Sequence, residues 1–205
     1  KKDKVSGACC QSPLHVRLLV PSWKNASQTS LKSKFFCQLR PSMTSSRSDL
    51  PTDVEFEPEF IAALHDIYEE KILFNQWMGL KVDSIKATGI VASLAMKPEL
   101  VGHYAYHRIH GGVISAVLDA MGSLAVMAAM GAKHMDEPVA KRLERFTRHS
   151  TIDLRIDFLR PGIGEKFIVH AEAMRVGARV GNARMEFCSA DGKLLSTGTA
   201  AYLTS

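Results

Sequence analysis

The segment from Val113 to Met130 constrains the fold most, because it is long enough for about five helical turns and is almost entirely apolar. Its only polar side chains are Ser115, Asp119 and Ser123, which are spaced four residues apart and so share one stripe of a helix. A helix that is apolar around the rest of its circumference has to be covered, and the Asp119 charge indicates cover by protein instead of lipid. The segment therefore predicts a central core helix with one carboxylate on a polar stripe.

A glycine pair, Gly111 and Gly112, lies directly before this helix and follows His110. Glycines at a helix start leave the backbone accessible, and the unpaired N–H groups and the positive end of the helix dipole favour negative charge there. Taken alone, Asp119 is open to a structural interpretation, in which it pairs with a basic side chain or caps a neighbouring backbone. Together with the glycine pair, it favours chemistry at a carbonyl group.

The spacing of these groups predicts how many subunits form the site. Gly112 and Asp119 are seven residues apart, which is about two helical turns, or roughly 10 Å along the axis. One chain alone cannot aim both at one carbonyl carbon. A site that uses both has to combine Gly111 or Gly112 of one subunit with Asp119 of another, as two antiparallel copies of the helix across a two-fold axis allow.

The positive charge of the chain is concentrated in residues 1–50, which hold nine Lys or Arg and two Asp or Glu. This leader carries a net charge of +7, so residues 51–205 carry −2, and neither a nucleic-acid-binding surface nor a membrane-binding one is indicated for the folded part. We expect the leader to be poorly ordered. Its scarcity of acidic groups is also what a mitochondrial transit peptide looks like, although a non-native leader would look similar.

The cysteine pattern favours a reducing compartment. Three of the four cysteines lie in the leader, and the adjacent pair Cys9-Cys10 lacks the two-residue gap of a zinc knuckle. The chain therefore has no disulfide framework, and a cytoplasmic location is the expectation, with a mitochondrial location as the alternative if the leader is a transit peptide. Length and composition predict one domain over residues 51–205.

Strand patterns surround the central helix. Residues 151–158 alternate between apolar and polar side chains, as a half-buried strand does. An amphipathic helix is expected before the first strand, through residues 60–74. With turns near residues 88, 161, 177 and 191, the pattern predicts an α+β hotdog fold, in which an antiparallel sheet wraps around one long helix. The strands are expected at residues 80–87, 90–96, 151–158, 166–176, 179–190 and 194–203.

From about residue 58 onward, the chain resembles hotdog-fold acyl-CoA thioesterases of the PaaI-like (phenylacetate-degradation protein) type. The resemblance rests on motifs in a fixed order: His110-Gly111-Gly112 with Asp119, Thr151-Ile152-Asp153-Leu154 with Phe158-Leu159-Arg160-Pro161, Arg175-Val176-Gly177, and Asp191-Gly192-Lys193-Leu194 with Thr197-Gly198-Thr199-Ala200. It implies hydrolysis of an acyl-CoA thioester, without a further cofactor, by a homodimer or a dimer of dimers.

The resemblance also implies roles for individual residues. Asp119 corresponds to the catalytic carboxylate, which serves as general base for water or as nucleophile. Gly111, with Gly112 beside it, corresponds to the residue whose backbone N–H polarises the thioester carbonyl. His110 shapes the start of the helix, and Thr151 supplies a hydroxyl that orients the water or the carboxylate.

One departure concerns the loop before His110, where family members often carry an Asn near the carbonyl or the sulfur. Here His103 or Tyr104 can substitute as a hydrogen-bond donor to the substrate. Arg175 and Arg179 flank a turn that the resemblance places near the coenzyme A entrance, where arginine suits phosphates, although arginine is also common at exposed strand ends. No metal is expected, because the histidines near residue 107 have no carboxylate at ligand spacing.

Two other functions compete with hydrolysis. The first is a non-catalytic acyl-CoA-binding module, since some hotdog domains are ligand sensors, although mere binding needs neither Asp119 nor the glycine pair. The second is a hydratase, which in this fold generally uses a histidine five residues after the helical Asp, where this chain has Leu124.

The leader yields a first testable prediction. A shortened chain that begins near residue 51 is expected to keep both the melting temperature and the thioesterase activity of the full chain, because the leader lacks the apolar pattern of a packed element. Thermal denaturation and turnover of the two chains check this. A lower melting temperature or a lost activity would show that the leader packs onto the domain.

Overall fold

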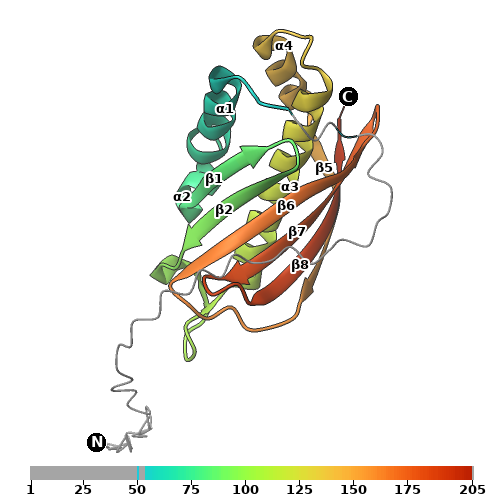
Figure 1. Ribbon diagram of the computed structural model, residues 1–205. Helices are drawn as coiled ribbons and strands as arrows, with labels where there is room; N and C mark the ends of the chain where they lie inside the picture. The colour runs from blue at the N-terminus through green and yellow to red at the C-terminus, as the bar shows by residue number, and fades with distance from the viewer. Residues whose placement is uncertain (1–49, 51–53, 205) are drawn as a thin grey trace, which may run out of the picture. The chain divides into compact units, whose positions relative to one another are not determined.

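The computed structural model describes residue 50 and residues 54–204, and they form a hotdog fold (Figure 1). One antiparallel sheet of six strands has the order β1-β2-β6-β7-β8-β5, so the strands predicted from sequence are confirmed within a residue or two. The predicted leader, apart from its last residue, lies outside the described residues. The strands are β1 (Leu80–Lys86), β2 (Gly89–Ala95), β5 (Ser150–Phe158), β6 (Lys166–Val176), β7 (Val180–Ser189) and β8 (Leu194–Leu203).

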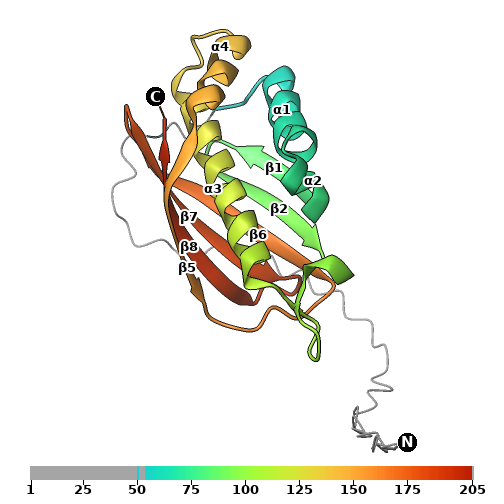
Figure 2. The same ribbon diagram turned by 180° about the vertical axis from the view of Figure 1, so that it is seen from behind.

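The central helix α3 (Gly111–Lys133) lies across one face of this sheet (Figure 2). Among the described residues it is the helix long and apolar enough to cross a membrane, but 72% of its most apolar 18-residue window is buried in the domain. Ser115, Asp119 and Ser123 are half-buried, whereas the helix is otherwise mostly buried. The core-helix prediction is confirmed, and the polar stripe reaches β5 at Asp119, which accepts a hydrogen bond from Thr151.

The opening helix is interrupted, which the sequence pattern did not predict. It consists of α1 (Pro58–His65), a π-helical turn (Asp66–Lys71) and α2 (Leu73–Met78). The extended backbone at Ile72 separates the last two, so the apolar periodicity is out of phase after it. Leu73 and Phe74 therefore point to solvent, being 71% and 56% exposed.

The connector between α3 and β5 folds into α4 (Val139–Glu144) and a 3-10 turn (Arg145–Arg148). Arg142 of α4 is buried, pairs with the Glu57 carboxylate at 2.6 Å and lies over the Phe60 ring at 4.6 Å from its centroid. A buried cation needs such a partner, because an unpaired charge in the interior is strongly destabilising. Arg142 therefore ties α4 to α1.

A small hairpin holds the start of α3 in place. It consists of β3 (Val101–His103) and β4 (Arg108–Ile109), preceded by a 3-10 turn at Pro98–Leu100. The N–H of His110 donates to the Leu100 carbonyl at 2.8 Å, and the N–H of Ile109 donates to the Gly162 carbonyl at 2.9 Å. The first turn of α3 is thus fixed from two sides by backbone hydrogen bonds.

Strand β5 forms one edge of the sheet and, within the described residues, pairs with β8 alone. The alternation predicted for β5 is interrupted by a bulge between Thr151 and Asp153, which puts Thr151 on the same face as Leu154. Ile152 and Phe158 are 55% and 56% exposed. Leu159 and Ile163, which follow the strand, are 49% and 54% exposed. An edge strand of nine residues with exposed apolar side chains is a template for pairing with another chain.

Candidate active site

His110 forms the N-cap of α3. Its backbone is extended, and its Nδ1 atom accepts a hydrogen bond of 2.9 Å from the Gly112 N–H. The cap satisfies one of the donors that a helix start leaves unpaired. A Cβ on Gly112 would lie 2.9 Å from the same Nδ1 atom, so the second glycine is what allows the imidazole to approach the backbone. This geometry agrees with the role of His110 that the resemblance implies.

The N–H of Gly111 is left open by this arrangement. In the part of the chain that the structure describes, no acceptor pairs with it, whereas the neighbouring N–H groups of Gly112 and Val113 donate to His110. A Cβ on Gly111 would lie 3.4 Å from the Phe158 ring, so the glycine also has an aromatic wall beside it. Of the two glycines, Gly111 therefore offers the free donor at the positive end of the α3 dipole.

Asp119 faces the edge strand. The Thr151 hydroxyl at the start of β5 donates to Asp119 Oδ1 at 2.9 Å. No cation of the described residues forms an ion pair with Asp119, so pairing with a basic side chain does not explain this carboxylate. Asp119 is half-buried, less than the apolar helix alone suggested, and a ligand can approach its stripe.

Both ends of the candidate site lie beside the same strand. The first part of β5 contacts Asp119 through Thr151, and its last residue, Phe158, lies beside Gly111. Within one chain, the candidate base and the candidate oxyanion donor remain about two helical turns apart, as their spacing requires. Both therefore lie along the strand that ends the sheet in the described part of the chain.

An aromatic cluster backs the middle of α3, and sequence reasoning missed it. The Tyr202 hydroxyl donates to the Asp119 backbone carbonyl at 2.9 Å, and the Tyr68 hydroxyl is 2.7 Å from Ser123 Oγ. His149 stacks on Tyr202 at 5.3 Å and on Phe146 at 6.3 Å between ring centroids. A signal for Tyr202 existed: it lies at an inward position of its strand, where a buried phenol needs a partner.

The residues expected to contact substrate lie at the two ends of α3. His103, the last residue of β3, stacks on Tyr104 in the loop that follows, and both are exposed and close to the glycine end. Arg175 and Arg179 are exposed at the turn between β6 and β7, beside Val176, whose carbonyl accepts from Lys133 at the other end of α3. One chain therefore does not bring the two pairs together.

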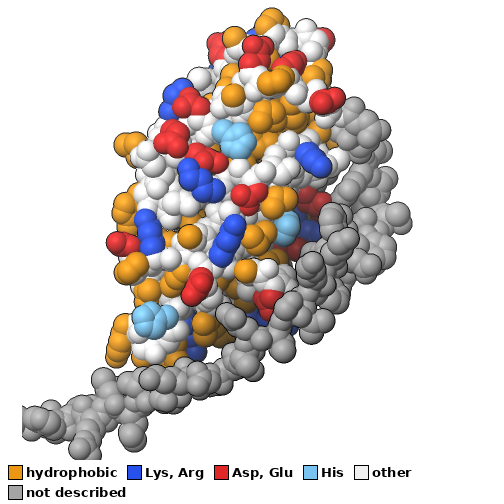
Figure 3. All heavy atoms as spheres, turned by 60° about the vertical axis from the view of Figure 1, so that its left-hand side comes forward, with side chains coloured by type: hydrophobic (Ala, Val, Ile, Leu, Met, Phe, Trp, Pro, Cys, Tyr) orange, Lys and Arg blue, Asp and Glu red, His pale blue; other side chains and the backbone are white. Residues whose placement is uncertain are grey.

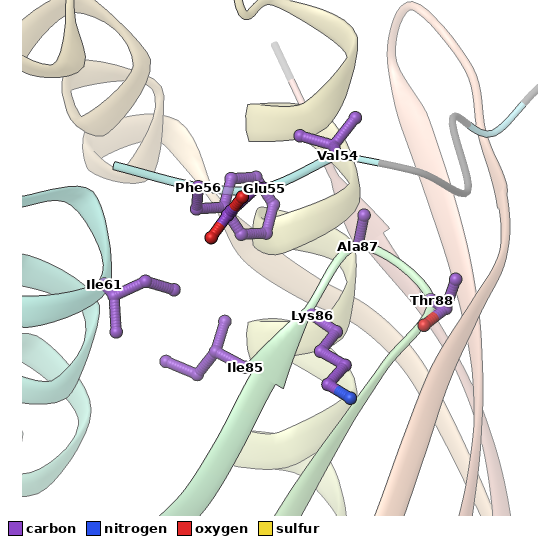
Figure 4. Close-up of a pocket in the computed structure, with 8 residues that line it drawn as sticks. All are labelled: Val54, Glu55, Phe56, Ile61, Ile85, Lys86, Ala87 and Thr88. Carbon is purple, nitrogen blue, oxygen red and sulfur yellow. The ribbon is translucent and has the colours of Figure 1, made fainter. Parts of the chain in front are cut away.

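A pocket lies elsewhere, between the segment before α1, α1 itself and the β1–β2 turn (Figure 4). Figure 4 shows Ile61 and Ile85 projecting into the space between α1 and β1. Since β1 and β5 are opposite edges of the sheet, this pocket is separate from the Asp119 site.

The side of the domain that carries α1 mixes acidic and basic side chains, with no single-sign patch (Figure 3).

Comparisons with known proteins identify the family. Residues 106–196 match the Thioesterase superfamily. Over 130 residues the chain is 32% identical to the medium/long-chain acyl-CoA thioesterase YigI of Salmonella typhimurium, a match that spans 63% of this chain and 84% of that protein. The YigI protein of Escherichia coli K12 is 31% identical over the same lengths.

Solved structures of other proteins support the same family and fold. A Shewanella oneidensis protein related to the thioesterase superfamily superposes with a TM-score of 0.68 at 31% identity, over 73% of this chain and all of that one. The E. coli PaaI protein has a TM-score of 0.57 at 16% identity, over 72% of this chain and 94% of its own, and supports the fold. The fold and the site thus define a hotdog thioester hydrolase. The chain belongs to the thioesterase superfamily.

The aromatic cluster predicts a pH dependence of stability. Burial lowers the pKa of His149 to about 4, and the Leu203 backbone beside the ring offsets only part of this. Between that value and the ordinary histidine value of 6.5, the unfolded chain binds more protons than the folded chain. The free energy of unfolding is therefore expected to fall as pH decreases from about 6.5 to about 4, by at most about 3 kcal/mol from this group.

Urea denaturation of the protein and of the His149→Phe variant across this pH range measures the effect. Phe keeps the stack on Tyr202 but cannot be protonated. The free energy of unfolding of the variant is therefore expected to fall less steeply between pH 6.5 and pH 4 than that of the wild-type protein. Equal slopes in the two proteins would contradict the assignment.

Proposed function

We propose that this protein hydrolyses acyl-CoA thioesters to a free acid and coenzyme A. The YigI relatives, named as medium/long-chain acyl-CoA thioesterases, support this substrate class. The single structural observation that carries the proposal is the open Gly111 N–H at the start of the helix that also carries Asp119. No cofactor beyond the coenzyme A of the substrate takes part.

In the proposed reaction, Asp119 acts as general base or as nucleophile. As a base, the carboxylate takes a proton from water while the water oxygen bonds to the thioester carbonyl carbon. The carbonyl oxygen becomes an oxyanion, which the Gly111 N–H and the α3 dipole stabilise. The intermediate then collapses, the C–S bond breaks, and the coenzyme A thiolate recovers a proton. Thr151 holds the carboxylate, and Gly112 admits the His110 cap.

The site is proposed to be shared between two copies of the chain. An antiparallel pairing of two β5 edges centred between Leu154 and Arg155 brings Thr151 of one copy opposite Phe158 of the other. Asp119 of one subunit then approaches Gly111 of its partner. The exposed apolar residues of β5 support this pairing, because it would remove them from water. A homodimer is the minimal active unit, and a dimer of dimers would contain two such pairs.

The same two-fold arrangement suggests where coenzyme A binds. Antiparallel copies carry the turn between β6 and β7 of one subunit past the glycine end of its partner's α3. Arg175 and Arg179 would thus approach His103 and Tyr104, with the guanidinium groups placed for phosphate oxygens. His103 or Tyr104 would donate near the carbonyl or the sulfur.

The two competing functions have less support. A non-catalytic binding module has no use for an open backbone donor and a carboxylate held by a hydroxyl, and the relatives are named as enzymes. A hydratase would need a histidine where Leu124 stands, and Leu124 is fully buried in the core.

The Asp119→Asn variant tests the proposed base. The amide keeps the shape of the side chain and removes the proton acceptor, so we expect the fold to be retained and kcat to fall by about 10²-fold or more. Assays over a series of acyl-CoA chain lengths measure this, with the exposed Asp136→Asn as a matched control that keeps wild-type turnover. A folded Asp119→Asn protein with near wild-type kcat would remove Asp119 from the mechanism.

A mixed dimer tests whether the site is shared. Asp119→Asn lacks the carboxylate, and Gly111→Val crowds the open N–H, so each homodimer is expected to be inactive. In the heterodimer one site carries both defects and the other carries neither. Co-expression with two tags and purification of heterodimers should recover about half the wild-type activity per dimer. Correctly folded heterodimers as inactive as both parents would exclude a shared site.

A further inference from the structure

We propose that Tyr202 is a positioning residue of the hydrolytic reaction, which acts by fixing Asp119 on α3. The inference rests on the proposed function, because it assigns Tyr202 a role only through the Asp119 carboxylate. It adds a residue from β8, the strand that neighbours the edge strand, to a site otherwise built from α3 and β5.

Two hydroxyl groups converge on Asp119 from adjacent strands. Thr151 and Tyr202 are direct partners in the β5–β8 register, so their side chains leave the sheet on the same face. The Thr151 hydroxyl donates to the carboxylate at 2.9 Å, and the Tyr202 hydroxyl donates to the backbone carbonyl of the same residue, also at 2.9 Å. One pair of cross-strand neighbours thus holds both the backbone and the side chain of Asp119.

The bond from Tyr202 is additional to normal helix geometry. In an α-helix the Asp119 carbonyl already accepts from the N–H four residues later, so the phenol is a second donor to one oxygen. This donor limits rotation of the helical turn that carries the carboxylate. Catalytic groups need placement within about 0.5 Å, so a fixed turn matters for a base that has to meet a water molecule.

The sequence of α3 makes room for the phenol. Gly122 lies beside the Tyr202 hydroxyl, and a Cβ on this residue would overlap that hydroxyl and lie 2.7 Å from Met185 Sδ. Glycine in the middle of a helix is destabilising relative to alanine. The close approach of Tyr202 is the physical reason that glycine is needed here.

Tyr202 remains a donor at any working pH. Burial is the largest cause that raises the pKa of Tyr202, and the negative charge of Asp119 raises it further. The phenol therefore stays protonated, which excludes Tyr202 as a competing base and leaves its hydrogen free to donate to Asp119.

The chain offers a matched pair of variants to test this role. Tyr202→Phe and Tyr68→Phe each remove one buried phenol hydroxyl that reaches α3, at residues 119 and 123 respectively. If Tyr202 positions Asp119, Tyr202→Phe lowers kcat about 10-fold or more and leaves KM for the acyl-CoA within twofold. Tyr68→Phe is expected to keep kcat within twofold, even where both variants lower the melting temperature alike.

Two further measurements exclude a merely structural effect. Gly122→Ala, which displaces the hydroxyl without removing it, is expected to reproduce the loss of kcat at unchanged KM. In the Asp119→Asn background, Tyr202→Phe is expected to cause no further loss of the residual turnover, because its role runs through the carboxylate.

The outcomes separate the two proposals. If Asp119→Asn keeps wild-type turnover, the proposed function fails, and the role of Tyr202 fails with it. If Asp119→Asn is inactive but folded Tyr202→Phe matches Tyr68→Phe in kcat, the role of Tyr202 is overturned while the proposed function stands. The role of Tyr202 is also overturned if Tyr202→Phe raises KM without lowering kcat. It is overturned as well if Tyr202→Phe lowers kcat by the same factor in the wild-type and the Asp119→Asn proteins.

Discussion

The burial of α3 against the curved sheet is the constraint on which the rest of the structure depends. Leu118, Leu124 and Val126 are fully buried, so the helix cannot rotate without exposing apolar surface to water. Its orientation is therefore fixed, and with it the position of the half-buried polar stripe. Asp119 lies on that stripe beside Ala120, which is also half-buried, whereas Leu118 is fully buried.

Strand β5 connects this core to the candidate site. It is held to the sheet through β8, yet its outer edge and part of its apolar face are open. The same strand contacts Asp119 through Thr151 and lies beside Gly111 through Phe158. In the proposed dimer, the interaction that covers the apolar edge is also the one that completes the site, so assembly and activity depend on the same surface.

Behind the candidate site, aromatic side chains from distant segments hold the turn of α3 that carries Asp119. Tyr68 comes from the π-helical turn, His149 from the connector and Tyr202 from the last strand, and their rings and hydroxyls meet beside residues 119–123. The neutral His149 ring and the protonated phenols place no competing charge near Asp119. The cluster thereby couples the stability of the domain, including its expected sensitivity to acid, to the placement of one carboxylate.

The sequence by itself determined the central helix, its polar stripe, the strands and the glycine pair at the helix start, because these follow from periodicity and from the local geometry of helix ends. The two-turn separation of Gly111 and Asp119 was also readable, since helical rise is constant. Only the tertiary structure decided which glycine keeps a free N–H, that β5 is an edge strand, that Arg142 is buried and that Tyr202 reaches Asp119. These depend on strand order and on contacts between residues as far apart as 119 and 202, which no local pattern encodes.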